Sequence, residues 1–282
     1  MKIAVASGKG GTGKTTVAVA LATAQSEPVQ YIDCDVEEPN GFIFIAPEVT
    51  GTYTVCVQIP RVDESKCNSC GKCAEFCRFN ALVSLGSPPL VFPELCHSCG
   101  GCEIVCPQGA ISWNEHPVGE LTFGVKYDSA LRAIQGKLNI GSVLAPPVIR
   151  AAKKAASNTP LTIIDCPPGT SCPVIEALSG ADFVLLVTEP TPFGLHDLKL
   201  AVETVKELRL PFSVIINRSD VGDLRVEDYC REHGIPVILL IPHSRTIAEV
   251  YSRGGTLLDA VPEMAEAASA TQPDDSAIEE FY

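Results

Sequence analysis

The sequence predicts an α/β fold in which a doubly wound, mostly parallel sheet is interrupted by a small, cysteine-rich α+β insertion. At the start of the chain a glycine-rich loop joins an apolar strand to an apolar helix. Strand-like and helix-like segments alternate through the second half, which is typical of a parallel sheet covered on both faces. Between residues 60 and 115 the composition shifts to Cys, Pro, Gly and Ser. We therefore expect a discontinuous core, residues 1–59 and 116–282, around an inserted domain, residues 60–115.

The loop at the start of the chain predicts a phosphate site. Residues 2–6 predict a buried strand and residues 16–24 a helix, and the loop between them fits G-x-x-x-x-G-K-[ST]. Glycine amides and a helix N-terminus favour an anion there. Lys14 would reach the outer phosphates, and the Thr15 hydroxyl would hold Mg²⁺. The residues expected to bind the nucleotide are Gly8, Gly10, Gly11, Thr12, Gly13, Lys14, Thr15 and Thr16.

Acidic residues end two further predicted strands, residues 29–33 and 161–165. Ligands of parallel α/β sheets bind at the carboxyl ends of the strands. Asp165 is therefore predicted to hold Mg²⁺ through its water shell, a helix N-cap being the alternative. Asp33 and Asp35 would hold Mg²⁺ through water or orient an attacking water. The alternative for this pair is a turn with two solvated carboxylates.

The rest of the core continues the alternation of strands and helices. Residues 42–59 predict extended structure, and further strands are expected at 121–127, 183–187, 212–216 and 235–241. Helices are expected at 146–156, 195–208, 223–233 and 244–253. Asn217 follows one of these strands at the ligand-binding edge, where a turn is the alternative to a binding role. Residues 189–191 are expected to form a loop without assigned chemistry.

Eight of the thirteen cysteines form two runs of identical spacing, 29 residues apart. The runs are Cys67-x₂-Cys70-x₂-Cys73-x₃-Cys77 and Cys96-x₂-Cys99-x₂-Cys102-x₃-Cys106. Each matches the bacterial ferredoxin run, in which the fourth thiolate ligates the other cluster. One [4Fe–4S] cluster is thus predicted on Cys67, Cys70, Cys73 and Cys106, and a second on Cys77, Cys96, Cys99 and Cys102. Zinc sites usually show paired C-x₂-C units instead.

The bulk composition narrows the function classes. A net charge of −13 argues against binding nucleic acid or anionic lipid. The longest apolar runs are too short to span a bilayer. A phosphate loop seven residues into the chain leaves no room for a signal peptide, so we expect a cytoplasmic protein without disulfides. His97 is expected to face solvent, and Cys166 and Cys172 to be buried as small hydrophobic residues. The tail, residues 263–282, lacks a basic amphipathic face.

The segment from Ser7 to Thr16, with Lys9 before the glycines, resembles the deviant Walker A loop of the MinD/Mrp/nitrogenase-iron-protein class of P-loop ATPases. Residues 33–40 resemble the first switch of that class, and Asp165-Cys166-Pro167-Pro168-Gly169-Thr170-Ser171 resembles the second switch of its Mrp branch. With the cysteine runs, the whole chain resembles members that carry an inserted two-cluster ferredoxin domain.

This resemblance implies roles for single residues. Lys9 would reach across a dimer interface to the nucleotide of the partner subunit, as part of a nucleotide-sandwich dimer. Asp35 would orient or deprotonate the attacking water, and Asp33 would lie near the metal or structure the switch. Asn217 would read the adenine edge.

The function implied is Mg-ATP hydrolysis by a homodimer, or by a heterodimer with a related ATPase. Nucleotide binding would be coupled to electron transfer or to contact with a redox or metal–sulfur protein. The cofactors implied are ATP, Mg²⁺ and two [4Fe–4S] clusters, with no nucleic-acid or membrane partner. Two alternatives stay open: an iron–sulfur cluster assembly or delivery ATPase, and a spatial-organisation or scaffold ATPase whose clusters are structural.

Overall fold

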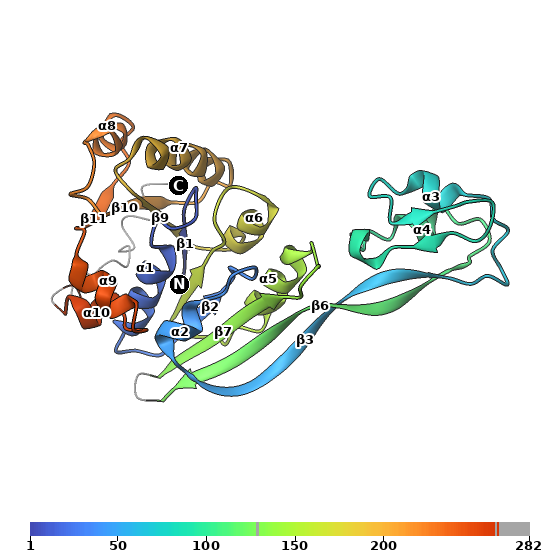
Figure 1. Cartoon of the computed structure of the whole chain (residues 1–282), viewed down its shortest axis with the longest axis horizontal. Helices are drawn as coiled ribbons and strands as arrows, with labels where there is room; N and C mark the ends of the chain where they lie inside the picture. Colours follow the sequence, from blue (N-terminus) through green and yellow to red (C-terminus); the bar gives the residue numbers. More distant parts are fainter. Residues whose placement is uncertain (128–129, 263, 265–282) are drawn as a thin grey trace.

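The computed structural model describes residues 1–127, 130–262 and 264, and the prediction for the tail, residues 263–282, lies outside these apart from residue 264. Among the described residues, nine strands form one sheet in the order β11-β10-β9-β1-β8-β2-β7-β6-β3 (Figure 1). The first seven strands of this order are mutually parallel. The predicted α/β class with a mostly parallel sheet is therefore confirmed.

The parallel strands are short and, towards the centre, buried on both faces. They are β1 (Lys2–Ala6), β2 (Val29–Asp33), β7 (Leu131–Leu138), β8 (Leu161–Asp165), β9 (Phe183–Thr188), β10 (Phe212–Asn217) and β11 (Val237–Ile241). Every residue of β2, β8 and β9 is buried. Strands of this kind need helices on both faces to remove their apolar side chains from water.

The helices supply this cover as two layers, each with its own apolar core. On one face lie α5 (Ala145–Lys154), α6 (Cys172–Leu178), α7 (Pro192–Glu207) and α8 (Arg225–Glu232). On the other lie α1 (Lys14–Thr23), α2 (Gly41–Ile45), α9 (Arg245–Tyr251) and α10 (Leu257–Ala260). No helix of the described residues has the length and apolar character needed to cross a membrane.

The antiparallel end of the sheet differs from the expectation. Strand β6 (Ile111–Lys126) is much longer than the predicted 121–127, and β7 was not predicted. At the start of the segment 42–59, which was expected to be extended, residues 41–45 form the helix α2. This turn is stabilised because Gly41 N–H donates to the Asp33 carboxylate and because Phe44 and Ile45 are buried. Strand β3 (Glu48–Val62) then pairs with β6 along its whole length.

Strands β3 and β6 continue beyond the sheet as a two-stranded ribbon. The last pair that β6 forms with β7 is Gly119 with Leu138, whereas β3 and β6 stay paired as far as Val62 and Ile111. The ribbon carries residues 63–110, here called the inserted module, away from the core (Figure 1). The predicted domain boundaries at residues 60 and 115 fall inside these strands, and the division into a core and an inserted ferredoxin-like domain stays a prediction.

The inserted module repeats one backbone pattern twice. Its elements are α3 (Lys72–Phe76), β4 (Leu82–Val83), β5 (Leu90–Val91), a 3₁₀ turn (Pro93–Leu95) and α4 (Gly101–Ile104). Positive φ angles recur at positions 29 apart: 56° and 52° at Ser69 and Ser98, and 73° and 80° at Gly71 and Gly100. The repeat seen in the cysteine spacing is therefore also a repeat of chain conformation.

Candidate functional site

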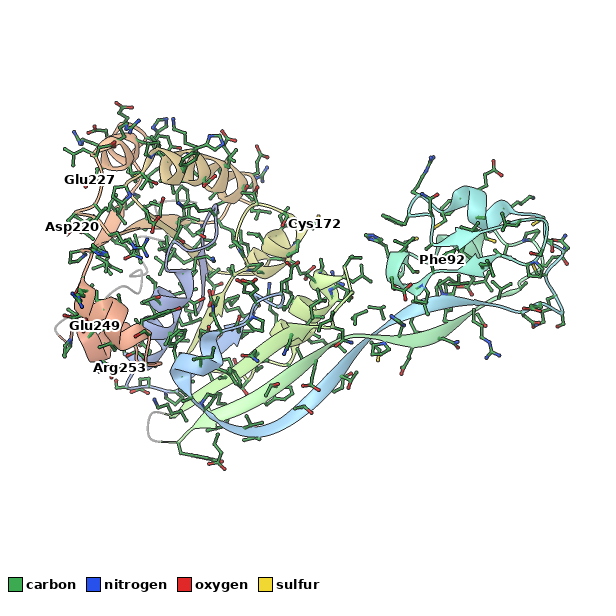
Figure 2. All side chains as sticks on the ribbon, in the orientation of Figure 1. Phe92, Cys172, Asp220, Glu227, Glu249 and Arg253 are labelled. Atoms are coloured by element: carbon green, nitrogen blue, oxygen red, sulfur yellow. The ribbon has the colours of Figure 1, made fainter. Side chains whose placement is uncertain are left out.

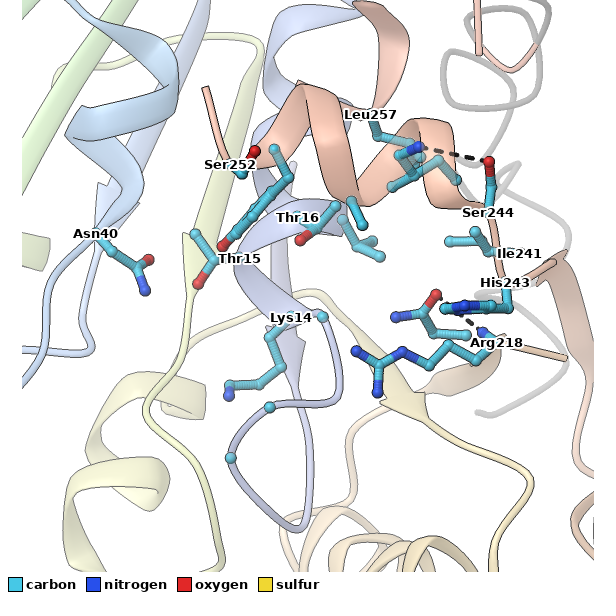
Figure 3. Close-up of a pocket in the computed structure, with 18 of the residues that line it drawn as sticks. Lys14, Thr15, Thr16, Asn40, Arg218, Ile241, His243, Ser244, Ser252 and Leu257 are labelled. Carbon is cyan, nitrogen blue, oxygen red and sulfur yellow. Dashed lines mark hydrogen bonds between the residues drawn. The ribbon is translucent and has the colours of Figure 1, made fainter. Parts of the chain in front are cut away.

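A cavity of about 450 Å³ opens at the carboxyl ends of the parallel strands (Figure 3). Its lining brings together residues that the sequence predicted from three separate segments: the loop before α1, Asp35 after β2, and Asn217 at the end of β10. The opposite wall comes from the segment that includes His243, Ser244 and Tyr251. The volume lies within the usual range for a small-molecule site.

The loop before α1 has the conformation that its glycines allow. Gly11 and Gly13 have φ of 78° and 95°, in the left-handed region that favours glycine. Lys14 and Thr15 open α1, whose N-terminus has no side-chain cap, so its first amides are available to a ligand. Gly8 is different, because a Cβ there would collide with the backbone of Asp197 on α7. Gly8 and Thr12 thus support the loop and do not line the cavity.

Asn217 is fixed to the loop by its amide. Its Nδ2 donates to Thr12 O at 2.8 Å, and its Oδ1 accepts from Arg218 N–H at 3.0 Å. A side-chain amide has two N–H groups and two lone pairs, so one of each remains for a ligand. The residue predicted to read a base therefore also connects the end of β10 to the phosphate loop.

Asp165 lies fully buried beneath the first turn of α1. Its Oδ2 accepts from the Tyr31 hydroxyl at 3.0 Å, while its Oδ1 is buried without a hydrogen-bond partner. Burial raises the pKa of Asp165 to about 6, although Thr15 and Lys14 beside it favour the carboxylate. A buried, unpaired carboxylate oxygen is costly unless a cation or its water completes it. The donor set of Thr15 and Asp165 therefore fits a Mg²⁺ ion with its water shell.

Asp33 is used within the fold. Its carboxylate accepts from the backbone N–H groups of Asp35, Asn40 and Gly41 at 3.1, 3.1 and 2.9 Å. Burial, and then the neighbouring Asp165, raise its pKa well above the ordinary value. Of the two roles predicted for Asp33, these contacts favour structuring the segment 34–41 over holding the metal.

Asp35 is half-buried at the cavity. Burial raises its pKa to about 6, Lys14 opposes the rise, and Glu38 and Glu37 add to it. A carboxylate in this position faces the same space as the phosphate loop. It can accept a hydrogen bond from a water molecule there.

Lys9 points to an acidic residue that the sequence interpretation left without a role. Its Nζ lies 3.3 Å from Glu189 Oε2, and Arg218 Nη1 lies 2.8 Å from Glu189 Oε1. Glu189 follows β9 and is almost completely buried. The signal was available, since Glu189 is a carboxylate at a strand end, as are Asp33 and Asp165. What the sequence did not contain is the distance to Lys9.

The second predicted thiol set lines one cavity of about 240 Å³ in the inserted module. Cys77 from the first run lies there with Cys96, Cys99 and Cys102 from the second. The Ser98 N–H donates to Cys96 Sγ at 3.4 Å, and the buried Ser98 Oγ has no partner. Burial raises the pKa of Cys102 to about 11, and the Cys96 and Cys99 thiols beside it add to the rise.

In the first predicted thiol set, three of the four cysteines, Cys67, Cys73 and Cys106, lie near one another. Burial raises the pKa of Cys73, and the neighbouring Cys106 and Cys67 thiols raise it further. Cys106 Sγ accepts from Ala110 N–H at 3.3 Å. Within the part of the chain that the structure describes, no three His, Cys, Asp or Glu side chains are gathered around a point that a single metal ion could fill.

Three remaining residues can be compared with their predictions. His97 is exposed, as expected, and stacks on Phe79 with ring centroids 3.6 Å apart. Cys166 is buried as expected, but the prediction for Cys172 is wrong. Cys172 is the first residue of α6 and lies at the surface of the core, because the apolar face of this short helix is made by Val174, Ala177 and Leu178 (Figure 2).

Comparison with known proteins supports the nucleotide-binding fold of the core. Residues 3–257 match the family described as the CobQ/CobB/MinD/ParA nucleotide binding domain. An uncharacterized protein of Methanocaldococcus jannaschii is 31% identical over 268 residues, 92% of this chain and 91% of the relative. An iron–sulfur cluster carrier protein of Pyrococcus abyssi is 22% identical over 259 residues, 90% of this chain and 68% of the relative.

Two solved structures share the fold. The septum site-determining protein MinD of Pyrococcus horikoshii, complexed with Mg-ADP, aligns with a TM-score of 0.58 at 19% identity, covering 99% of this chain and 94% of that one. A chain of the MinC:MinD cell division protein complex of Aquifex aeolicus aligns with a TM-score of 0.60 at 16% identity, covering 97% of this chain and 96% of that one.

Replacing Asp35 by Asn is expected to stabilise the ligand-free protein at pH 7. The folded-state pKa of about 6 lies above the ordinary 3.8, so the folded chain binds the proton more tightly than the unfolded chain. Stability due to this group is therefore lost as pH rises from about 4 to about 6, and Asn avoids the loss. Because the carboxyl is partly exposed, we expect a gain of about 1 kcal/mol rather than the full value of the shift.

Urea unfolding in EDTA at pH 7 and near pH 4 measures this difference. The gain for Asp35→Asn should be largest at pH 7 and nearly vanish near pH 4. Glu48→Gln, the same kind of change at an exposed carboxylate away from Asp35, is the matched control. Equal gains at the two pH values would contradict the assignment of the effect to the Asp35 proton.

Proposed function

The chain belongs to the CobQ/CobB/MinD/ParA family of nucleotide-binding domains, and we propose that it is a Mg-ATP-hydrolysing member that carries two [4Fe–4S] clusters. In this proposal the nucleotide state of a dimer is coupled to electron transfer or to contact with a redox or metal–sulfur protein. The observation that carries the proposal is that one cysteine of the first run and three of the second line a single cavity. The ribbon that bears this cavity leaves the sheet beside the nucleotide cavity.

The nucleotide chemistry would follow from the residues around the larger cavity. The loop amides and Lys14 bind the phosphates and offset the negative charge that grows during phosphoryl transfer. Thr15 and Asp165 would hold Mg²⁺, which would supply positive charge to offset the negative charge of the phosphates. Asp35 accepts a hydrogen bond from the attacking water and orients it. Asn217 lines the same cavity beside the loop, and a base bound there would contact its remaining N–H and lone pair.

The eight cysteines of the module would hold the clusters in the crossed sets that the spacing predicts. Cys77, Cys96, Cys99 and Cys102 fit one cluster because they share a cavity, and a four-iron cluster needs more space between its ligands than a single ion. Backbone N–H groups already donate to Cys96 and Cys106, and such bonds stabilise thiolates. When bound, the clusters supply one-electron redox chemistry.

Anaerobically purified protein should contain about eight iron atoms and about eight sulfides per chain. Cys77→Ser should change the same cluster signal, by low-temperature electron paramagnetic resonance, as Cys96→Ser does. Cys73→Ser should change the other signal. Cys56→Ser, an exposed cysteine outside the module, is the control and should change neither. Zinc in place of iron and sulfide, or Cys77→Ser matching Cys73→Ser, would refute the crossed assignment.

Hydrogen bonds connect the nucleotide cavity with the base of the ribbon. Leu138 N–H donates to the carbonyl of Val36, the residue after Asp35, at 2.7 Å. The next residue, Asn139, donates from its backbone N–H to Val118 O at 2.9 Å and from Nδ2 to Pro117 O at 3.1 Å. Pro117 is paired with Cys56, next to a β-bulge at Val118 where β6 leaves the sheet. A movement of the segment after Asp35 would therefore displace the residues of β6 at which the ribbon begins.

The inserted module lies close to this same segment. Pro93 and Glu94, just before Cys96, line a cavity of about 240 Å³ together with Asn139 and Ile140. A contact network with two arrangements is what coupling between distant sites requires. We propose that ATP binding shifts the segment 34–40. Through Leu138 and Asn139, this shift would move the place where Pro93 and Glu94 of the module face the core.

Asn139→Ala should weaken this coupling without removing either site. It deletes one neutral hydrogen bond, worth about 1 kcal/mol, and leaves the backbone bonds in place. The expected result is that the change in cluster reduction potential on adding Mg-ATP falls to about half or less, with iron content unchanged. Redox titration with and without Mg-ATP measures it, and Asn114→Ala, on the exposed part of β6, is the control.

An ATP-induced shift of normal size in Asn139→Ala would contradict the path. If Mg-ATP leaves the potential of the wild-type protein unchanged, coupling to electron transfer is refuted, and the scaffold function with structural clusters is favoured.

Lys9 would act in the dimer, and Glu189 would hold it back in the single chain. Lys9→Ala should abolish Mg-ATP-dependent dimerisation, because the developing interface loses a cation facing the phosphates of the partner subunit. Glu189→Gln should lower the ATP concentration needed for dimerisation by roughly 2- to 5-fold, the size expected for a partly screened ion pair. Light scattering after gel filtration in Mg-ATP measures both, with the exposed Lys137→Ala as control. A dimer of Lys9→Ala as stable as wild type would refute the role of Lys9.

A second function, delivery of iron–sulfur clusters, is favoured by one comparison. The Pyrococcus abyssi relative bears the name iron–sulfur cluster carrier protein. Delivery requires loss of cluster iron to an apo-acceptor protein, whereas electron transfer leaves the iron in place. Iron analysis of both proteins after anaerobic incubation with Mg-ATP separates the two functions.

A further inference from the structure

Tyr31 is a polar residue at the centre of the most buried strands of the sheet. It lies on β2, is fully buried, and belongs to the apolar core between the sheet and α1. A phenylalanine would fill the same space without a hydroxyl to satisfy, so a buried tyrosine at this point calls for a partner. The partner is Asp165 Oδ2 on the adjacent strand β8, at 3.0 Å.

The geometry points to Tyr31 as a positioning residue: its hydroxyl holds the Asp165 carboxylate so that Oδ1 is left free for the water shell of Mg²⁺. This inference rests on the proposed Mg-ATP function and deepens it, by naming a residue that acts on the metal through Asp165.

The sheet register explains how the two residues meet. Tyr31 is paired with Ile163, and Asp33 is paired with Asp165, so Tyr31 reaches its partner diagonally across neighbouring strands. Both side chains lie on the face that α1 covers, and α1 begins with Lys14 and Thr15. The bond therefore forms directly beneath the part of the loop that would hold the phosphates and the metal.

The Tyr31–Asp165 hydrogen bond gives the two carboxylate oxygens of Asp165 different roles. Oδ2 is occupied by Tyr31, and Oδ1 is buried without a partner. A phenol has an ordinary pKa of about 10, so at neutral pH Tyr31 is protonated and donates. A hydrogen bond to one oxygen fixes the rotation of the carboxylate and hence the direction of the other oxygen.

The same hydroxyl packs against the start of α2. A Cβ at Gly41 would collide with the Tyr31 hydroxyl, and Gly41 N–H donates to Asp33 Oδ2 at 2.9 Å. The phenol is therefore confined between the segment that Asp33 organises and the carboxylate of Asp165. This confinement is what a positioning residue needs, because a mobile donor would not fix the carboxylate.

Tyr31→Phe tests the inference, because it removes one hydroxyl and keeps the ring that fills the core. Equilibrium binding of a fluorescent ATP analogue is measured in EDTA and then as Mg²⁺ is titrated in. The affinity in EDTA should stay within about twofold of wild type, while the Mg²⁺ concentration for half-maximal effect should rise about tenfold, the low end for loss of an outer-sphere partner. Tyr53→Phe, the same change at an exposed site, is the control.

A double-mutant comparison shows whether Tyr31 acts through Asp165. In an Asp165→Asn background, adding Tyr31→Phe should cause no further loss of Mg²⁺ dependence. Additive losses would overturn the inference, as would an unchanged Mg²⁺ midpoint in Tyr31→Phe. Loss of binding in EDTA as well would assign Tyr31 a packing role and also overturn it. Failure of the wild-type protein to bind Mg-ATP would instead refute the proposed function on which the inference rests.

Discussion

The parallel pairing of β8 with β1 on one side and β2 on the other is the constraint on which the nucleotide cavity depends. It brings the ends of three strands to one edge, so that the loop after β1 comes together with Asp165 at the end of β8 and Asp33 at the end of β2. None of these residues is near another in sequence. Each group is held by backbone pairing, which is rigid compared with a side chain on a loop, so the donors are in place before a ligand arrives.

Burying carboxylates at this edge costs free energy, and a bound cation would lower that cost. Asp33, Asp35 and Asp165 all have raised pKa values because burial disfavours their ionised forms. Their neighbours compensate in part: three backbone N–H groups serve Asp33, and Tyr31 serves Asp165. Such a site is less stable alone than an apolar core of the same size would be. Stability given up at a binding site is a common feature of functional residues.

The ribbon of β3 and β6 gives the thiol-bearing module a defined place relative to the core. Its strands are hydrogen-bonded through the sheet and on into the ribbon, and so they differ from a flexible linker. A β-bulge at Val118 of β6 lies at the base of the ribbon, and such a bulge bends a pair of strands without breaking their pairing. The module therefore stands beside the loop at Asn139, at the end of the sheet that also carries Asp35. In the function proposed here, this arrangement makes a mechanical link between the two sites short.

Sequence alone determined the features that are written in consecutive residues: the phosphate loop with Lys14 and Thr15, the apolar strands ending in Asp33 and Asp165, and the two cysteine runs. Their physics is local, since glycine conformation, strand burial and ligand spacing act over a few positions. Tertiary structure alone decided what depends on sheet order and on distances across the fold. It decided that β3 and β6 continue beyond the sheet as a ribbon, that Glu189 pairs with Lys9 and Arg218, and that Tyr31 donates to Asp165 on the adjacent strand. It also placed Cys172 at the surface, because the short helix that it opens turns other side chains inward.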